Sequence, residues 1–308
     1  MKILVSYLLI CQLILYAGNI IKPIPEHIKV NIQKAKLGEK LFFDPVLSRD
    51  HTISCSSCHD LKNGGDDGLV YSYGIHGRRG NINAPTVYNA VFNFRQFWDG
   101  RAKDLQEQVA DPIQNPVEMD MDFPSLIARL EHIKWYKDKF DSIYSDGITK
   151  QNISNAIAEY EKTLITPNSP FDRYLKGDEN AISPKAKKGY EVFKYKGCII
   201  CHSGINVGGN LYNKFGIYED TNSTNLGRYN VTHREEDKYV FKVPSLRNIS
   251  QTAPYMHDGR FHTLKEAVDY MSQVQLGRYM SDEEIEDIIE FLKTLKGKKP
   301  IGIENDKR

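Results

Sequence analysis

Apolar side chains recur at helical spacing in several segments of the chain. The last segment is the clearest, because Ser281 and Glu284 are spaced as a capping box and apolar residues follow them three and four positions apart. Pro124 and Pro184 favour helix starts close by. Since no segment of comparable length alternates with period two, the pattern predicts a mainly α-helical fold with long loops. The predicted helices cover residues 32–42, 123–140, 150–164, 183–194 and the segment after Ser281.

The same order of apolar, polar and turn-forming residues occurs twice. Residues 35–42 correspond to 186–193, residues 83–101 to 242–260, and residues 157–164 to 288–295. This internal duplication predicts two tandem domains of one kind. The stretch 166–184 is rich in turn-forming residues and belongs to neither repeat. The domain boundary is therefore expected there, with domains at 19–166 and 167–308.

The first 18 residues differ from the rest of the chain. Their apolar run, residues 3–16, is too short to cross a bilayer comfortably and suits the core of a signal peptide. We therefore expect residues 1–18 to direct export and to be removed. An uncleaved membrane anchor stays open as an alternative, because only one Lys precedes the run and the cleavage site is not a clean pair of small residues.

Composition narrows the class of protein. The chain has 308 residues, of which 40% are hydrophobic and 26% charged, as expected for globular domains that bury a core. Lys and Arg number 41 against 40 Asp and Glu, which gives a net charge of +1. This balance argues against nucleic acid as a partner.

Four of the five cysteines form two pairs, each followed directly by a histidine. Two thiols at this spacing can form thioethers with the two vinyl groups of one haem, and the histidine supplies an imidazole to the iron. A shared zinc site, a redox pair and paired disulfides are the alternatives. The histidine after both pairs favours two covalently attached haems c. The motifs are Cys55-Ser56-Ser57-Cys58-His59 and Cys198-Ile199-Ile200-Cys201-His202.

The second axial ligand decides whether a c-type haem only carries electrons or also reacts. When the repeats are aligned, Met271 of the second domain falls opposite Pro112 of the first. The second haem can therefore have a His/Met ligand pair, while the first has no methionine at that place. Met256 and Met280 are rivals for the ligand role. Met119 and Met121, near the first motif, are interpreted as packing residues, with a ligand role for either as the alternative.

At this point the sequence resembles the bacterial dihaem cytochrome c peroxidases, with the methylamine-utilisation dihaem enzyme as a relative. The resemblance covers essentially the whole chain after the leader. It implies two tandem cytochrome c-like haem domains, and it is carried by residues 41–44, 83–86, 96–102, 111–119, 252–259 and 275–277.

The resemblance implies different roles for the two haems. The first, with His59 as proximal ligand, would react with peroxide at low potential. The second, with His202 and Met271, would accept electrons at high potential. His76 matches a histidine that covers the first iron in the resting oxidised enzyme and leaves when the second haem is reduced, and its flanking glycines suit a loop that rearranges.

The resemblance also implies three further sets of residues. Glu118 and Gln108 match the distal pair, with Glu118 as the general base and acid and Gln108 orienting peroxide. Trp98 matches a tryptophan between the two haems, where an indole would assist electron transfer. Ca²⁺ would bind between the domains, to Asn83 and to the backbone carbonyls of Thr252 and Pro254.

The function that the resemblance implies is reduction of H₂O₂ to two waters with two electrons and two protons. The electrons would come from a small donor in the periplasm, a monohaem cytochrome c or similar protein, and the enzyme would be a homodimer. A dihaem electron carrier without substrate is one alternative. Another is a protein-modifying dihaem oxidase, which would have Tyr in place of Met271.

Overall fold

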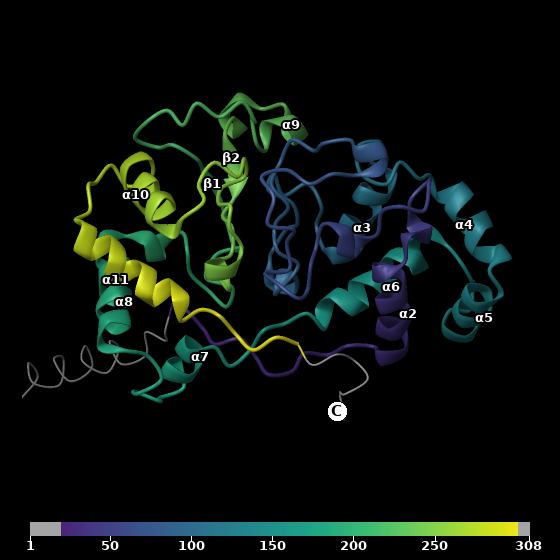
Figure 1. The fold of residues 1–308 in the computed structure, drawn as a ribbon, viewed down its shortest axis with the longest axis horizontal. Helices are drawn as coiled ribbons and strands as arrows, with labels where there is room; N and C mark the ends of the chain where they lie inside the picture. Colours follow the sequence, from purple (N-terminus) through teal and green to yellow (C-terminus); the bar gives the residue numbers. More distant parts are fainter. Residues whose placement is uncertain (1–19, 301–308) are drawn as a thin grey trace, which may run out of the picture.

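The computed structural model describes residues 20–300, which form two lobes side by side, each with its own hydrophobic core (Figure 1). The members of one core all lie between residues 35 and 164, and those of the other between 171 and 295, with Ile21 added. The fold is therefore mainly helical with two domains, as predicted. The predicted signal peptide, residues 1–18, lies outside the described residues.

The first domain is built around the crossing of its first and last helices, α2 and α6. Met119 and Met121 lie in its core, so the interpretation of these two residues as packing residues is confirmed. The prediction of one helix over 123–140 is wrong, because the helix ends at His132 and a second begins at Lys134. The helices are α2 (Ile32–Phe43), α3 (Leu105–Gln114), α4 (Phe123–His132), α5 (Lys134–Ile143) and α6 (Lys150–Lys162).

The second domain repeats this crossing with α8 and α11. The capping box of Ser281 and Glu284 is present at the start of α11, as predicted. A two-stranded antiparallel ribbon, β1 (Tyr212–Lys214) with β2 (Val240–Lys242), faces the first domain (Figure 1). The helices are α7 (Pro170–Leu175), α8 (Pro184–Lys196), α9 (Tyr229–Thr232), α10 (Leu264–Val274) and α11 (Asp282–Lys293).

A glycine at corresponding positions lets each pair of helices touch. A Cβ atom built on Gly38 of α2 would lie 1.9 Å from the carbonyl oxygen of Ala156 in α6. One built on Gly189 of α8 would lie 1.8 Å from the carbonyl oxygen of Asp287 in α11. In both domains the helix backbones therefore approach too closely for any residue other than glycine. The first helix of each crossing also contacts the Cys-Cys-His motif of its domain.

The first described residues pack against the second domain, although they precede the first domain in sequence. Ile21 lies in the second core, and residues 20–31 run back to α2 along the lower edge of the molecule (Figure 1). Arg247 and Asp172 form a salt bridge of 2.7 Å with both side chains 0% exposed. Arg247 also donates to the carbonyl oxygen of Lys22, so a buried ion pair holds this segment in place.

At the junction between the domains, one side chain from each domain donates a hydrogen bond to the same hydroxyl group. Asn89 and Asn248, which correspond in the repeat and both have left-handed backbone angles, each donate a side-chain hydrogen bond to Oγ1 of Thr166, at 2.8 and 3.0 Å. The polar boundary segment is thus tied to both domains at the same atom. None of the described residues forms a helix long and apolar enough to span a membrane.

The helix crossing makes a stability prediction. Gly189→Ala should lower the free energy of unfolding by about 2–3 kcal/mol, because overpacking against a backbone carbonyl outweighs the ~1 kcal/mol that alanine adds to helix propensity. Denaturant unfolding of the haem-loaded protein, followed by circular dichroism, measures the change. Gly80→Ala is the matched control: its Cβ would lie 3.5 Å from the nearest atom, so a shift within about 0.5 kcal/mol is expected. Equal shifts for both variants would contradict the prediction.

Candidate functional site

Both Cys-Cys-His motifs adopt the same local structure. Each starts with a single 3-10 turn, η2 (Cys55–Ser57) in the first domain and η5 (Cys198–Ile200) in the second. In each the histidine N–H donates to the carbonyl oxygen of the first cysteine, at 3.1 Å for His59 and 2.9 Å for His202. All four thiols are free, so within the described chain the pairs do not form disulfides.

The two histidines are suited to bind a metal ion. Burial lowers the pKa of His59, and it lowers that of His202 to about 4, so both imidazoles are neutral near pH 7. A neutral imidazole is the form that ligates iron. His59 Nδ1 lies 3.2 Å from the carbonyl oxygen of Gly65, and a hydrogen bond there leaves Nε2 free for the iron.

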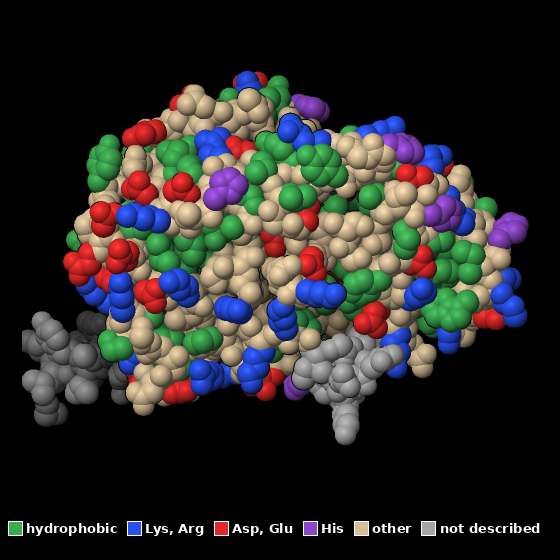
Figure 2. All heavy atoms as spheres, in the orientation of Figure 1, with side chains coloured by type: hydrophobic (Ala, Val, Ile, Leu, Met, Phe, Trp, Pro, Cys, Tyr) green, Lys and Arg blue, Asp and Glu red, His purple; other side chains and the backbone are tan. Residues whose placement is uncertain are grey.

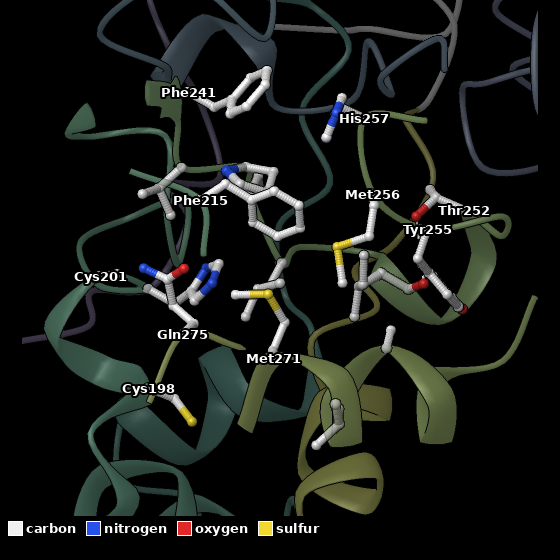
Figure 3. A pocket seen from close by; sticks show the side chains of 18 of the residues that line it. Cys198, Cys201, Phe215, Phe241, Thr252, Tyr255, Met256, His257, Met271 and Gln275 are labelled. Carbon is white, nitrogen blue, oxygen red and sulfur yellow. Dashed lines mark hydrogen bonds between the residues drawn. The ribbon is translucent and has the colours of Figure 1, made fainter. Parts of the chain in front are cut away.

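A largely apolar cavity opens beside the second motif. Cys198, Cys201 and His202 line it, and the sulfur atoms of Met271 and Met256 both point into it (Figure 3). Met271 lies on α10 and its repeat counterpart Pro112 lies on α3, as the alignment predicts. Met280 also lines the cavity, so all three methionines considered for the ligand role line the same cavity.

Lys242 shows that this cavity suits a group with negative charges. Its side chain lines the cavity, the residue is only 6% exposed, and burial lowers its pKa to about 8. Among the described residues its ammonium group has no hydrogen-bond or ion-pair partner. A buried cation needs a counter-charge, and haem carries two propionates. The thiols, the imidazole, the methionine and this lysine therefore fit a covalently bound haem. Sequence reasoning missed Lys242, although the repeat places it opposite Asn83.

The cavity reaches the contact between the domains, where residues that correspond in the repeat meet. Trp98 and His257 lie edge to face with ring centroids 6.1 Å apart. Asn83 N–H donates to the carbonyl oxygen of His257 at 2.8 Å, and Lys242 N–H donates to that of Trp98 at 2.7 Å. Trp98 Nε1 donates to the carbonyl oxygen of Asn83 at 2.9 Å. The indole is thus fixed between the two domains.

Glu118 lies in the loop after α3, close to the first motif. Asn115 donates to its Oε1 at 2.6 Å. Burial raises the pKa of Glu118. Burial also raises the pKa of Cys55 and Cys58, and the charge of Glu118 adds a smaller contribution in the same direction. Gln108 is half-buried on α3, and within the described chain its side chain makes no hydrogen bond. The structure thus gives the first motif a half-buried carboxyl group.

His76 is exposed in this structure. It lies in the turn η3 (Ile75–Gly77) with a left-handed backbone, φ 56°. Its side chain is 57% exposed, and Nδ1 lies 3.4 Å from Oδ2 of Asp50. The loop rests on the Glu118 segment: Ile75 N–H donates to the carbonyl oxygen of Glu118 at 2.8 Å, and a Cβ on Gly74 would lie 2.1 Å from the carbonyl oxygen of Val117.

The three predicted calcium ligands, Asn83, Thr252 and Pro254, line the same cavity at the contact between the domains. Their surroundings are poor in charged ligands. No group of three or more His, Cys, Asp or Glu residues that could hold a metal ion occurs in the described part of the chain. Asp66 is buried nearby, and burial raises its pKa to about 6. Any cation here would rely on carbonyl and amide oxygens.

Comparisons with known proteins agree with the two-domain division. Residues 32–180 match the family described as di-haem cytochrome c peroxidase, and residues 186–296 match cytochrome c. The chain is 47% identical to cytochrome c peroxidase Ccp of Escherichia coli over 90% of its length, but spans only 61% of that protein. It is 45% identical to cytochrome c551 peroxidase of Nitrosomonas europaea, over 93% of this chain and 87% of that one.

A solved structure has the same fold. A MauG-like protein associated with microbial copper homeostasis superposes with a TM-score of 0.75 and 27% identity, over 90% of this chain and 93% of that one. The prediction of two haems c is therefore supported at the level of family and fold.

The two sulfurs in the cavity provide a test of the axial ligand. Met271→Leu should lower the potential of the second haem by on the order of 0.1 V or more, because methionine ligation raises the potential. Met256→Leu, a change of the same size in the same cavity, should leave it nearly unchanged. Spectroelectrochemical titration of both variants measures this. The reverse order of effects would make Met256 the ligand.

Proposed function

Because the chain belongs to the di-haem cytochrome c peroxidase family, we propose that it reduces H₂O₂ to water at the first motif with electrons that enter at the second. The observation that carries the proposal is the difference between two otherwise equivalent sites. The second has methionine sulfur facing its cavity, whereas the first has the half-buried carboxyl group of Glu118 beside it and Pro112 at the methionine position.

Haem, when bound through the two motifs, supplies the iron that accepts and delivers electrons and activates peroxide. The chain's residues hold and orient it. His59 and His202 provide neutral imidazoles, Met271 a thioether, and Lys242 a counter-charge for a propionate. Trp98 lies where the two domains meet and would assist electron transfer from the second haem to the first.

Glu118 would act on the protons of the substrate. Breaking the O–O bond requires a proton to leave one peroxide oxygen and to reach the oxygen that departs as water. Burial raises the pKa of this carboxyl group above its usual value, and such a shift favours a group that must both accept and donate a proton. Asn115 keeps Oε1 oriented. Gln108, with no competing hydrogen bond in the described chain, is available to orient peroxide.

The His76 loop would control access to this site. We infer that the exposed position beside Asp50 is the displaced state of the histidine, and that the resting oxidised enzyme holds His76 over the first iron. The contacts of Ile75 and Gly74 with the Glu118 segment support this coupling, because a movement of the loop would also move the backbone that carries the acid.

The electron donor would dock near the second motif. Ile200, between the two cysteines, is 74% exposed, and Tyr195 at the end of α8 is more exposed still. Apolar side chains exposed beside a cofactor suit a transient partner. The relative from Nitrosomonas europaea is named cytochrome c551 peroxidase. For this chain a small monohaem cytochrome c is therefore the proposed donor.

Figure 2 shows acidic and basic side chains interspersed on the face drawn, without a large basic area of the kind that binds nucleic acid.

Three further features remain proposals. We expect Ca²⁺ at Asn83, Thr252 and Pro254, where it would be bound by oxygen atoms that brace the contact between the domains. We expect export to the periplasm, where a small cytochrome donor would meet the enzyme. We also expect a homodimer, as the resemblance to the family implies.

Glu118→Gln tests the chemical step. The amide keeps the size and the contact with Asn115 but cannot exchange the proton, so peroxide turnover should fall by about 10²- to 10⁴-fold. Stopped-flow mixing of half-reduced protein with H₂O₂ isolates this step from donor docking. Both haems should stay attached, as a pyridine haemochrome assay checks. A rate equal to wild type would remove Glu118 from the mechanism.

His76→Gly and Asp50→Asn test the loop. Without the imidazole, the first haem should be high-spin or water-bound even when fully oxidised, and peroxide should react without prior reduction. With Asp50→Asn the displaced histidine loses its charged partner, so the closed state should be favoured and activation after half-reduction should slow. Electron paramagnetic resonance of the oxidised proteins and activation kinetics measure both effects. An unchanged low-spin first haem in His76→Gly would assign the distal ligand to another residue.

A further inference from the structure

Glu161 is a buried acid that the proposed mechanism does not use. It lies on α6 and is 6% exposed, and its Oε2 has no hydrogen-bond partner in the described chain. Burial alone raises its pKa to about 8. A carboxyl group kept in such surroundings costs free energy, which suggests a role other than packing.

The neighbours of Glu161 point to the first haem site. Burial is the main cause that raises the pKa of the Cys55 thiol, one of the two attachment points, and that of Tyr160 on the same helix. The charge of Glu161 raises both further. The other titratable groups in this part of the domain are Glu39 of α2 and Tyr88 of the loop before η4 (Ala90–Phe92), whose charges also raise the pKa of Tyr160. Within the described chain no Lys or Arg pairs with Glu161.

The repeat shows what this position faces. The residue that corresponds to Glu161 in the second domain is Leu292, on α11. Leu292 lines the cavity that contains Cys198, Cys201 and His202. Since α2 with α6 and α8 with α11 cross in the same way, Glu161 occupies the matching place against the first haem. One haem therefore has an apolar side chain at this point, and the other has a carboxyl group.

We propose that Glu161 is a redox-linked proton site: its carboxylate takes up one proton from solvent when the first haem gains one electron, and releases it when that haem is oxidised. The charges balance, since the added electron is matched by the added proton. The physical cause is repulsion, because an ionised carboxylate in a poorly solvated interior opposes the arrival of an electron nearby. The inference needs haem at both motifs but does not depend on the peroxide reaction.

The experiment measures both haem potentials in the holoprotein as a function of pH, from about pH 6 to 9, by spectroelectrochemistry. Because burial raises the pKa of Glu161 to about 8, the carboxyl group is protonated in both redox states well below pH 8. In wild type the potential of the first haem should therefore stay level at the acid end of this range and fall as pH rises above about 8, with a slope that approaches about 59 mV per pH unit, the one-electron equivalent of a tenfold change in proton activity. The potential of the second haem, beside Leu292, should change much less.

Glu161→Leu copies the second domain, and Glu161→Gln keeps the shape of the side chain without the titration. Either variant should flatten the pH dependence of the first haem, so Glu161→Gln decides the matter if the leucine variant fails to bind both haems. Glu159→Gln is the matched control on the same helix, because Glu159 already pairs with Lys162 at 2.6 Å, and it should keep the wild-type slope.

Glu118 is the rival group, since its charge also acts on Cys55 and Cys58. The inference is overturned if the first haem of wild type shows no pH dependence in this range, or if the slope survives in Glu161→Gln. It is equally overturned if the slope is lost in Glu118→Gln and kept in Glu161→Gln. In all these measurements the potential is read directly, without peroxide or donor.

Discussion

The two domains are held in register by a reciprocal pair of backbone hydrogen bonds. Asn83 donates to His257, and Lys242, its counterpart in the repeat, donates to Trp98, the counterpart of His257. Each domain gives one donor and one acceptor, so the contact has approximate two-fold symmetry. These bonds place the Trp98 ring against His257 at the contact between the domains. We propose that electrons pass between the domains at this contact.

The two domains share one backbone arrangement through duplication, and the chemistry of their haem sites differs because a few corresponding residues differ. The helix crossing at Gly38 and Gly189, the turn of each motif and the left-handed Asn89 and Asn248 are kept in both domains. Within this shared frame, three of the positions that differ in charge or ligand type bear most directly on the two haem sites. They are Pro112 against Met271, Asn83 against Lys242, and Glu161 against Leu292. The second site thus has a soft ligand and a cation, and the first has acids.

The duplication, the two Cys-Cys-His motifs and the final helix could be predicted from the sequence, because each is marked by the spacing of residues along the chain. The break after His132 could not be predicted, since neither Gly nor Pro interrupts the pattern and the turn at Ile133 depends on tertiary packing. Helix α7 was not predicted, because it is short and lies in a segment rich in turn-forming residues, although Ser169 and Asp172 form a capping box at its start. The orientation of His76 toward Asp50 also lies beyond sequence, because a loop flanked by glycines admits more than one position.

The packing of residues 20–24 on the second domain has a consequence for biosynthesis. The bond from Arg247 to Lys22 joins residues 225 positions apart, so the segment that leaves the ribosome early finds its partner only when most of the chain has been made. The first domain can fold before that moment, since Ile21 belongs to the other core. The second domain cannot cover its buried Arg247 and Asp172 until the early segment returns. Residues 20–24 are therefore made early but packed late, because the surface that they cover is made near the end of synthesis.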